Sequence, residues 1–231
     1  MCFFRKKTLV SSGVFQGFTD YHSHILPGVD DGIPNMEDAL AVLKCYEELG
    51  IATVWCTPHI MEDIPNTTAQ LKARFKELTS AYDGPIKLNL AAENMLDELF
   101  ETRLSDNDFL PLGEAGNYLL VETSYFTPPF NMDDTLKKIK NMGYFPVLAH
   151  PERYVYMDNK DYRKYHEMGV MFQLNVTSLS GGYGKVAQKK AEWLLKHNMY
   201  SFYGSDLHSL RSFQANINNK VNIDIPNENQ I

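Results

Sequence analysis

Histidines and acidic residues stand at the ends of short apolar runs along this sequence. Five of the seven histidines occupy such positions, and the other two, His166 and His197, lie in stretches with helical patterning. A single histidine of this kind is usually a packed or surface residue. Several histidines that share these positions with carboxylates indicate a binding site, because burying so many polar groups without a ligand is costly. The residues at the run ends are His22, His24, His59, Glu93, Glu122, His150, Asp206 and His208.

The spacing of these residues corresponds to one strand-plus-helix unit for each run. Positions 22, 59, 93, 122, 150 and 206, one per run, are separated by 37, 34, 29, 28 and 56 residues. The last interval has room for two units, with Asn175 at the intermediate strand end. His22 and His24 alternate along a strand, as do Asp206 and His208, so both members of a pair project to one side. Each pair is therefore expected to reach the same ion.

This combination of side chains predicts transition-metal chemistry. Imidazole together with carboxylate suits Zn, Mn or Fe, whereas oxygen ligands alone suit Mg or Ca. With Asp30, from the turn Val-Asp-Asp-Gly, the sequence offers nine candidate ligands. A catalytic ion uses about three protein ligands, so we expect two or three divalent ions. Four carboxylates against three such ions leave the site net positive, which predicts an anionic substrate and favours phosphate.

Arg153 follows His150 by three residues in the sequence His-Pro-Glu-Arg. A guanidinium on a proline-stiffened turn can donate to two phosphate oxygens at once. The alternative is that Arg153 only pairs with a nearby acid, Glu152 or Asp158. We favour phosphate binding, on condition that the metal site exists.

The cysteines exclude a cysteine-dependent phosphatase mechanism. The cysteines are Cys2, Cys45 and Cys56. That mechanism needs an arginine six residues after the cysteine, but the residues six positions after these three are Thr8, Ile51 and Glu62. They are too few and too irregular for a disulfide framework, so we expect a reducing cytoplasm as the location.

Seven short runs rich in β-branched and aromatic residues predict buried strands. They cover 18–24, 51–59, 86–93, 117–123, 144–152, 170–176 and 200–208. Helical patterns lie between them, at about 35–49, 71–82, 133–142, 159–168, 184–197 and 210–219. The alternation predicts an α/β fold with a mostly parallel sheet. Since no glycine-rich phosphate loop follows the first run, we favour a barrel over a doubly wound nucleotide-binding sheet.

Composition and charge narrow the class of protein further. The chain has 231 residues, 44% of them hydrophobic and 22% charged, which suits one folded domain. Its formal net charge of -7 argues against nucleic acid as a partner. No apolar run approaches the roughly 20 residues that span a bilayer, and the first residues make a poor signal peptide, so no membrane insertion is expected. We expect an N-terminal extension over 1–17, the domain over 18–219 and a loose tail over 220–231.

Seven segments resemble, in order, the motifs of the polymerase-and-histidinol-phosphatase (PHP) superfamily. They are DYHSHILPGVDDG (20–32), CTPHIM (56–61), AAENMLDE (91–98), YLLVETSY (118–125), VLAHPERY (147–154), QLNVTSLSGGYG (173–184) and GSDLH (204–208). Within this superfamily they are most similar to the manganese-dependent tyrosine-protein phosphatases of bacterial capsule and exopolysaccharide clusters. The match runs from about 20 to 213, and its four histidine motifs in sequence are far more specific than His-x-His alone.

The resemblance implies a single-domain, distorted (β/α)7 barrel with a trinuclear metal centre, for which Mn²⁺ is the expected ion and Fe or Zn the alternatives. It implies a phosphomonoester hydrolase in which Arg153 grips the phosphate. The implied substrate is phosphotyrosine on a tyrosine autokinase that controls polysaccharide export. The implied ligands are His22, His24, Asp30, His59, Glu93, Glu122, His150, Asp206 and His208.

Several alternatives stay open at this point. Asp30 and Asp31 are adjacent; the offset of Asp30 from His22 fits a ligand better, and either acid, or a bound water, is a candidate proton donor to the leaving group. The loop from Tyr125 to Phe130 forms either an aromatic wall beside the pocket or a packed rim. Rival functions are a histidinol-phosphatase-like enzyme, a metal-dependent nuclease or amidohydrolase, and a non-catalytic binding subunit. The sequence also leaves oligomerisation open.

Overall fold

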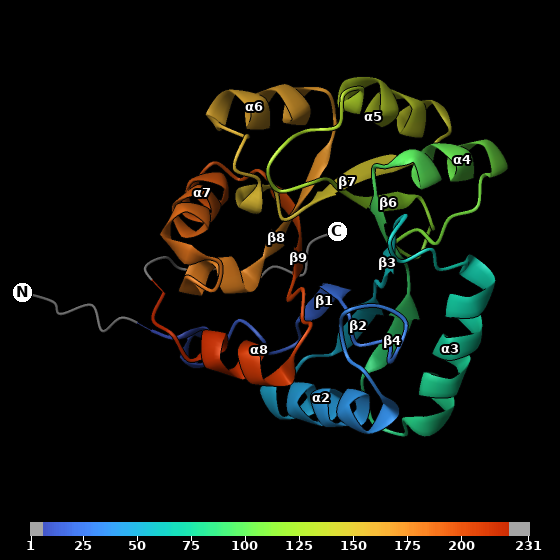
Figure 1. Cartoon of the computed structure of the whole chain (residues 1–231). Coiled ribbons are helices and arrows are strands. Elements are labelled where there is room, and N and C mark those ends of the chain that lie inside the picture. Colours follow the sequence, from blue (N-terminus) through green and yellow to red (C-terminus); the bar gives the residue numbers. More distant parts are fainter. Residues whose placement is uncertain (1–6, 222–231) are drawn as a thin grey trace, which may run out of the picture.

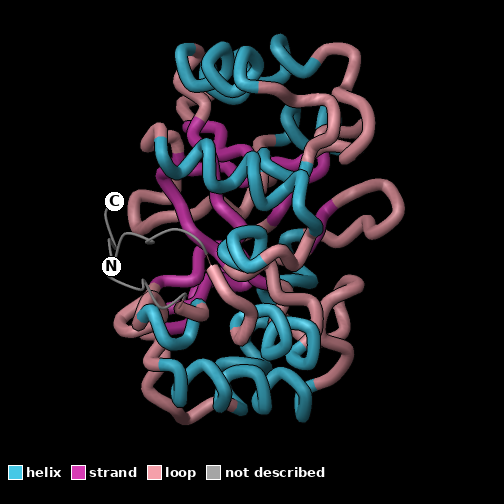
Figure 2. Tube along the Cα trace, turned by 90° about the vertical axis from the view of Figure 1, so that its left-hand side faces the viewer, coloured by secondary structure: helices cyan, strands magenta, loops and turns pink. Residues whose placement is uncertain are grey.

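A computed structural model of the chain describes residues 7–221 (Figure 1). Short strands occupy the centre of the molecule and helices lie around them (Figure 1). Figure 2, turned by 90°, likewise shows the strands in the interior, with helices above and below them. Within the described residues, no helix combines the length and apolar character needed to cross a membrane.

The strands of this part of the chain form two sheets in which every pairing between strands is parallel. One sheet has the order β1-β2-β4 and the other the order β3-β5-β6-β7-β8-β9. The strands are β1 (Thr19–Ser23), β2 (Thr53–Cys56), β3 (His59–Ile60), β4 (Lys87–Leu90), β5 (Glu93–Met95), β6 (Tyr118–Glu122), β7 (Phe145–Ala149), β8 (Met171–Asn175) and β9 (Tyr200–Gly204). The α/β class with parallel strands is thereby confirmed.

Two of the predicted strands are each divided into two short ones. The run 51–59 contains β2 and the start of β3, and the run 86–93 contains β4 and the start of β5. Backbone hydrogen bonds continue across the gap, from Ala91 N to Cys56 O (2.9 Å) and from Glu93 N to Pro58 O (3.1 Å). Pro58 has no N–H to donate, which interrupts its own strand at that position. The three-stranded sheet therefore passes directly into the six-stranded one.

The first and last strands also meet. Asp206 N donates to His22 O (2.7 Å) and His24 N donates to Leu207 O (3.0 Å), next to a parallel bridge between Ser23 and Leu207. This contact lies just beyond the C-terminal end of β9. The described strands do not form one closed hydrogen-bonded sheet, so the closed barrel remains a prediction.

Local sequence explains where the helices begin and end. Asn35 caps α2 by accepting a hydrogen bond from Asp38 N, and Gly50 ends that helix in the left-handed conformation, at φ 82°. The pattern over 71–82 belongs to α3, which begins after a capping box of Thr67 and Gln70. The sequence patterns missed α1 and α4. The helices are α1 (Leu9–Ser12), α2 (Met36–Leu49), α3 (Thr68–Ala81), α4 (Glu98–Asp106), α5 (Met132–Asn141), α6 (Asn159–Glu167), α7 (Gly184–Lys196) and α8 (Leu210–Ile217), with 3-10 turns η1 (Pro151–Arg153) and η2 (Val176–Ser180).

The first and last residues of the described part of the chain lie together. Thr8 and Lys220 form an antiparallel bridge, and Val221 N donates to Lys7 O (2.9 Å). Leu9 is fully buried in the main core. The predicted extension over 1–17 thus includes packed residues, while its first six residues lie outside the described part. The predicted tail over 220–231 begins at this bridge, and residues 222–231 are likewise not described.

Candidate metal centre

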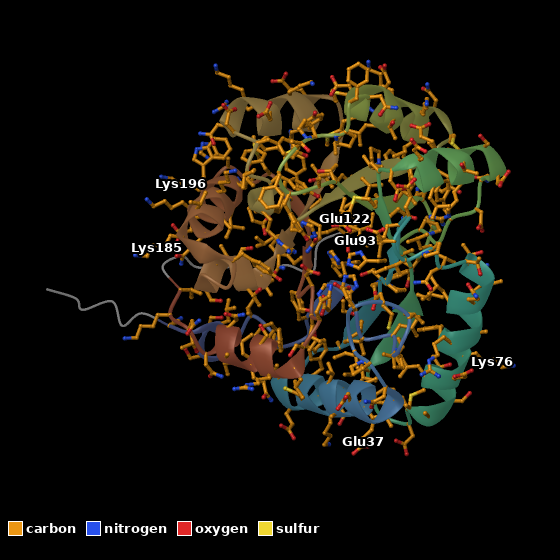
Figure 3. The ribbon with its side chains drawn as sticks, viewed as in Figure 1. Glu37, Lys76, Glu93, Glu122, Lys185 and Lys196 are labelled. Carbon is orange, nitrogen blue, oxygen red and sulfur yellow. The ribbon has the colours of Figure 1, made fainter. Side chains whose placement is uncertain are left out.

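The side chains predicted from the strand ends converge on one place in the interior. They come from β1 and the residue after it, from β3, β5 and β6, and from the segments after β7 and β9. The strands β3, β5, β6 and β7 are neighbours in the six-stranded sheet. Figure 3 shows Glu93 and Glu122 side by side near the middle of the molecule. Three groups of these residues have ligand atoms close enough to share an ion. Residues up to nearly two hundred positions apart therefore form one site.

The most deeply buried group consists of His22, His24, Glu93 and Asp206. Glu93 Oε2 lies 3.1 Å from His22 Nε2 and 3.3 Å from His24 Nε2. Asp206 Oδ1 lies 3.4 Å from each of these two nitrogens. The two imidazole nitrogens are themselves 3.1 Å apart. Two nitrogens and two carboxylate oxygens thus face one point.

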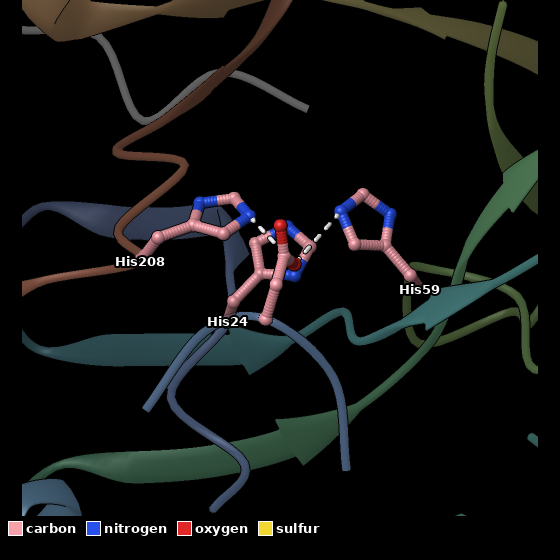
Figure 4. Close-up of side chains that lie close together, drawn as sticks. His24, His59 and His208 are labelled. Atoms are coloured by element: carbon pink, nitrogen blue, oxygen red, sulfur yellow. Dashed lines mark ion pairs between the residues drawn. The ribbon is translucent and has the colours of Figure 1, made fainter. Parts of the chain in front are cut away.

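A second group lies at the solvent side and consists of His24, Asp31, His59 and His208. Figure 4 shows the three imidazoles gathered around a carboxylate. Asp31 Oδ1 is 3.5 Å from His59 Nε2 and 3.4 Å from His208 Nε2. The side chain of Asp31 is 66% exposed and that of His208 is 30% exposed. This group therefore forms the open edge of the site.

The third group consists of His59, Glu93 and Glu122. His59 Nδ1 lies 3.2 Å from Glu93 Oε2 and 3.0 Å from Glu122 Oε1. His150 adjoins this group, since its Nε2 is 3.1 Å from Glu93 Oε1 and 3.9 Å from Glu122 Oε2. His24, His59 and Glu93 each belong to two groups, which links the three groups.

Several ligand atoms in these groups are buried and lack a hydrogen bond. Among the described residues these include His59 Nδ1, Glu93 Oε2, Glu122 Oε1 and Asp206 Oδ1. Buried polar atoms in folded proteins are almost always paired, because an unpaired one loses its hydration without compensation. Here the unpaired atoms are the same ones that face each other across about 3 Å. The donor set fits divalent cations, which would satisfy all four atoms at once.

Hydrogen bonds on the far side of three imidazoles turn their Nε2 atoms toward the site. His22 Nδ1 bonds Gln173 Oε1 (2.8 Å), His24 Nδ1 bonds Asp30 Oδ2 (2.8 Å) and His208 Nδ1 bonds Asp206 O (3.0 Å). Because each partner is an oxygen acceptor, Nδ1 donates its proton there, and Nε2 is the nitrogen that can ligate an ion. This is the arrangement that supports metal-ligating histidines.

Asp30 and Asp31 have different surroundings. Asp30 is bonded to His24, and its carboxylate also accepts from His59 N (3.0 Å) and Gly32 N (3.0 Å). Asp31 instead directs its carboxylate toward His59 and His208. Of the two, the structure places Asp31 within a group of ligand atoms, whereas the sequence favoured Asp30.

The electrostatics of the site favour bound positive charge. Burial alone would lower the pKa of His22, but the charges of Glu93 and Asp206 raise that pKa to about 9. Burial raises the pKa of Glu122, and the charge of Glu93 raises it further. Interaction with His208 lowers the pKa of Asp31 to about 2. Four carboxylates in so small a volume attract cations strongly, whether protons or metal ions.

A second buried network aligns the strands that carry these residues. The Asp20 carboxylate accepts from Tyr46 OH (2.8 Å) and from Ser205 N (2.8 Å), which connects β1 and α2 to the segment before Asp206. His150 and Asp206 have left-handed backbones, with φ of 33° and 50°. Such conformations cost energy for residues other than glycine and persist only where the surroundings enforce them. The fold therefore holds both side chains in position.

Arg153 lies beside the groups and lines a cavity of about 420 Å³ that opens onto them. Its guanidinium pairs with Asp206, not with either acid that the sequence suggested as an alternative. Glu152 is instead buried and accepts from Ser178 Oγ (2.8 Å) and Tyr200 OH (2.9 Å). Asp158 caps α6. The cavity is also lined by Asp31, His59, Tyr125, Tyr183, Asp206 and His208.

The predicted site residues are thus brought together, and three of their supporting residues were not singled out by the sequence. Gln173 orients His22, Asp20 joins β1 to Ser205, and Tyr183 packs against Arg153. Strand alternation offered one signal, because Gln173 lies two residues before Asn175 and so faces the same side. For Tyr183, in a glycine-rich turn, the sequence carries no comparable signal.

Comparisons with known proteins show the family to which the chain belongs. The family model described as "Capsular polysaccharide synthesis, CpsB/CapC" matches residues 18–223. The tyrosine-protein phosphatase CpsB of Streptococcus pneumoniae is 30% identical over 212 residues, covering 84% of each chain. The tyrosine-protein phosphatase YwqE of Bacillus subtilis (strain 168) is 27% identical over 204 residues, covering 84% of this chain and 78% of its own.

The fold has a solved counterpart as well. A crystal structure from work on B. subtilis YwqE and S. pneumoniae CpsB, described as unique metal-dependent tyrosine phosphatases, matches with a TM-score of 0.77. Its sequence is 26% identical, and the match covers 85% of this chain and 81% of the other.

Proposed function

The chain belongs to the CpsB/CapC family of capsular polysaccharide synthesis, and from this premise we propose that it is a metal-dependent protein-tyrosine phosphatase. One observation carries the proposal: eight histidine and acidic side chains converge beside an arginine that lines an open cavity. Relatives that cover most of the chain are named tyrosine-protein phosphatases, which supports the same activity.

For the metal centre we propose two or three divalent ions, with Mn²⁺ first and Fe or Zn as alternatives. One position would be held by His22, His24, Glu93 and Asp206, and a second by Asp31, His59 and His208. The third would be held by Glu93, Glu122 and, from its distances, His150, so the Glu93 carboxylate bridges two positions while each imidazole binds one ion. This assignment replaces Asp30 by Asp31 as a ligand and gives Asp30 the role of orienting His24. The support is geometric, since Asp31 and not Asp30 faces the other ligand atoms.

When bound, divalent ions would supply an activated water nucleophile and positive charge next to the phosphoryl oxygens. The guanidinium of Arg153 would donate to two of those oxygens and neutralise charge that develops during transfer. Asp30 is held by His24 and by backbone N–H groups, so it is poorly placed to deliver a proton. A tyrosine leaving group, with an ordinary pKa of about 10, needs little proton assistance compared with a serine alkoxide. The site therefore suits phosphotyrosine.

Three finer aspects belong to the same proposal. We propose a distorted (β/α)7 barrel, supported by the hydrogen bonds between the end of β1 and the segment after β9 and by those that continue from one sheet into the other. We propose a cytoplasmic location, supported by the sparse, irregular cysteines. As substrate we propose a tyrosine autokinase of capsule or exopolysaccharide synthesis, supported by the role that names the family. Histidinol-phosphatase, nuclease and amidohydrolase activities have no comparable support.

The proposal is tested by hydrolysis assays on the full chain with Mn²⁺ present. A phosphotyrosine peptide is expected to be hydrolysed, and the matched phosphoserine peptide about a hundredfold more slowly, because its leaving group depends on an acid catalyst. EDTA is expected to abolish turnover, and added Mn²⁺ to restore it. Full activity after complete metal removal would contradict the proposal, as would a preference for histidinol phosphate over the phosphotyrosine peptide.

A further inference from the structure

Arg153 is held by two tyrosines from separate segments of the chain. Its guanidinium carbon lies 4.4 Å from the ring centroid of Tyr125, in the loop after β6. It lies 4.0 Å from the ring centroid of Tyr183, in the turn before α7. Both distances are typical of close cation–π contacts, in which the positive guanidinium is attracted to the electron-rich ring face.

Both tyrosines are fixed by their own contacts. The Tyr125 ring packs against those of His150 and Tyr154, and its backbone oxygen accepts from Val155 N (2.8 Å). Tyr183 directs its hydroxyl toward Asp206 Oδ2 (3.4 Å). Tyr183 is 39% exposed at the rim of the cavity, so packing into the core is not its main contribution.

These contacts determine which part of Arg153 is available to a ligand. One edge of the guanidinium is engaged by Asp206, and the two rings cover much of its surface. The side chain nevertheless keeps 15% of its surface exposed and lines the cavity. An arginine side chain has about 2 kcal/mol of rotamer entropy, part of which a free arginine would lose on binding an anion. If the Arg153 side chain is already held in place before the anion binds, this loss of entropy is avoided.

On the basis of the proposed phosphatase function, we propose that Tyr125 and Tyr183 are positioning residues that hold Arg153 for phosphate binding. Neither tyrosine needs to touch the phosphoryl group, because each acts through the arginine. The aromatic ring makes the contact with Arg153, and the long hydroxyl contact of Tyr183 with Asp206 (3.4 Å) contributes little beside it. Phenylalanine is therefore expected to replace either tyrosine, while leucine, of similar apolar character but without the ring face, is not.

The test measures inorganic phosphate binding by calorimetry and kcat and KM on a phosphotyrosine peptide, with Mn²⁺ present. Tyr183→Leu is the main variant, because its partly exposed position makes folding least sensitive to the change. It is expected to weaken phosphate binding and raise KM about fivefold to twentyfold, the loss of one well-placed cation–π contact. Tyr125→Leu is expected to act in the same direction. Tyr183→Phe and Tyr125→Phe are expected to stay within about twofold of the wild type.

Tyr144→Leu is the matched control. Tyr144 precedes β7, at the end opposite to His150 and Arg153, and its ring contacts Phe109. This variant is expected to bind phosphate as the wild type does. Wild-type phosphate affinity in both leucine variants would overturn the inference, as would phenylalanine variants as weak as the leucine ones. A wild type that hydrolyses no phosphotyrosine peptide, but whose phosphate affinity falls in Tyr183→Leu, would instead contradict the proposed function alone.

Discussion

Replacing Glu93 by glutamine is expected to lower the rate of phosphotyrosine hydrolysis by about a thousandfold or more. Glu93 belongs to two of the three groups of ligand atoms. Its Oε2 lies within 3.3 Å of nitrogens of His22, His24 and His59. The amide keeps the shape but loses the charge, and it cannot place an oxygen toward every one of these neighbours. The variant is therefore expected to bind less manganese, which plasma mass spectrometry of the purified protein measures.

Glu114→Gln is the control for this change. Glu114 is an exposed glutamate that pairs with Lys87 (3.2 Å) on the surface. We expect its metal content and turnover to match the wild type. A Glu93→Gln protein that keeps both full metal content and full turnover would show that the three groups do not form the reactive centre.

Replacing Arg153 by alanine is expected to reduce kcat/KM by about a hundredfold to a thousandfold, the range found when one preorganised donor to a transition state is removed. Arg153→Lys is expected to recover only a small part of this loss. Lysine keeps the charge but has no planar fork to donate to two oxygens or to pack over Tyr125 and Tyr183. Steady-state kinetics on a phosphotyrosine peptide measure both variants, and manganese content is expected to stay near the wild-type value.

Arg163→Ala provides the matched control for the loss of an arginine. Arg163 lies on α6 and packs over Trp193, with its guanidinium carbon 5.7 Å from the ring centroid. It is expected to have wild-type kinetics. Equal activity of wild type, Arg153→Ala and Arg163→Ala would remove Arg153 from the site.

Local sequence rules were sufficient for the ligands that stand at strand ends. The alternation of a strand places His22 and His24 on one side, and the parallel arrangement brings the ends of successive strands together. His59, Glu93 and Glu122 could be identified in the same way because each ends a recognisable apolar run. The helix over 35–49 was likewise predictable, since its cap, Asn35, directly precedes it in the sequence and its terminating residue, Gly50, directly follows it.

The choice between Asp30 and Asp31 could not be made from the sequence. Both lie in one turn, and the direction of each carboxylate depends on a partner far along the chain. Asp30 is held by His59 N, which belongs to β3, and Asp31 faces His208, which follows β9. Offset from His22, the only criterion that the sequence offered, carries no information about these partners.

The tyrosine contacts of Arg153 and the division of two predicted strands could not be predicted from the sequence, for the same reason. Tyr125 and Tyr183 meet at the guanidinium from segments 58 positions apart, so no local pattern relates them. The interruption between β2 and β3 lies at Pro58. A proline lacks the backbone N–H, so its effect on a strand depends on whether a neighbouring strand lies on the side where that donor is missing. In each case the outcome depends on tertiary contacts.

The most direct test of the metal centre is a crystal grown with Mn²⁺ and measured with X-rays close to the manganese absorption edge. Anomalous difference density is expected within the groups formed by His22, His24, Glu93 and Asp206, by His24, Asp31, His59 and His208, and by His59, Glu93 and Glu122. Density inside at least two of these groups is the predicted result. An active protein whose manganese lies elsewhere, with none of the three groups occupied, would contradict the account.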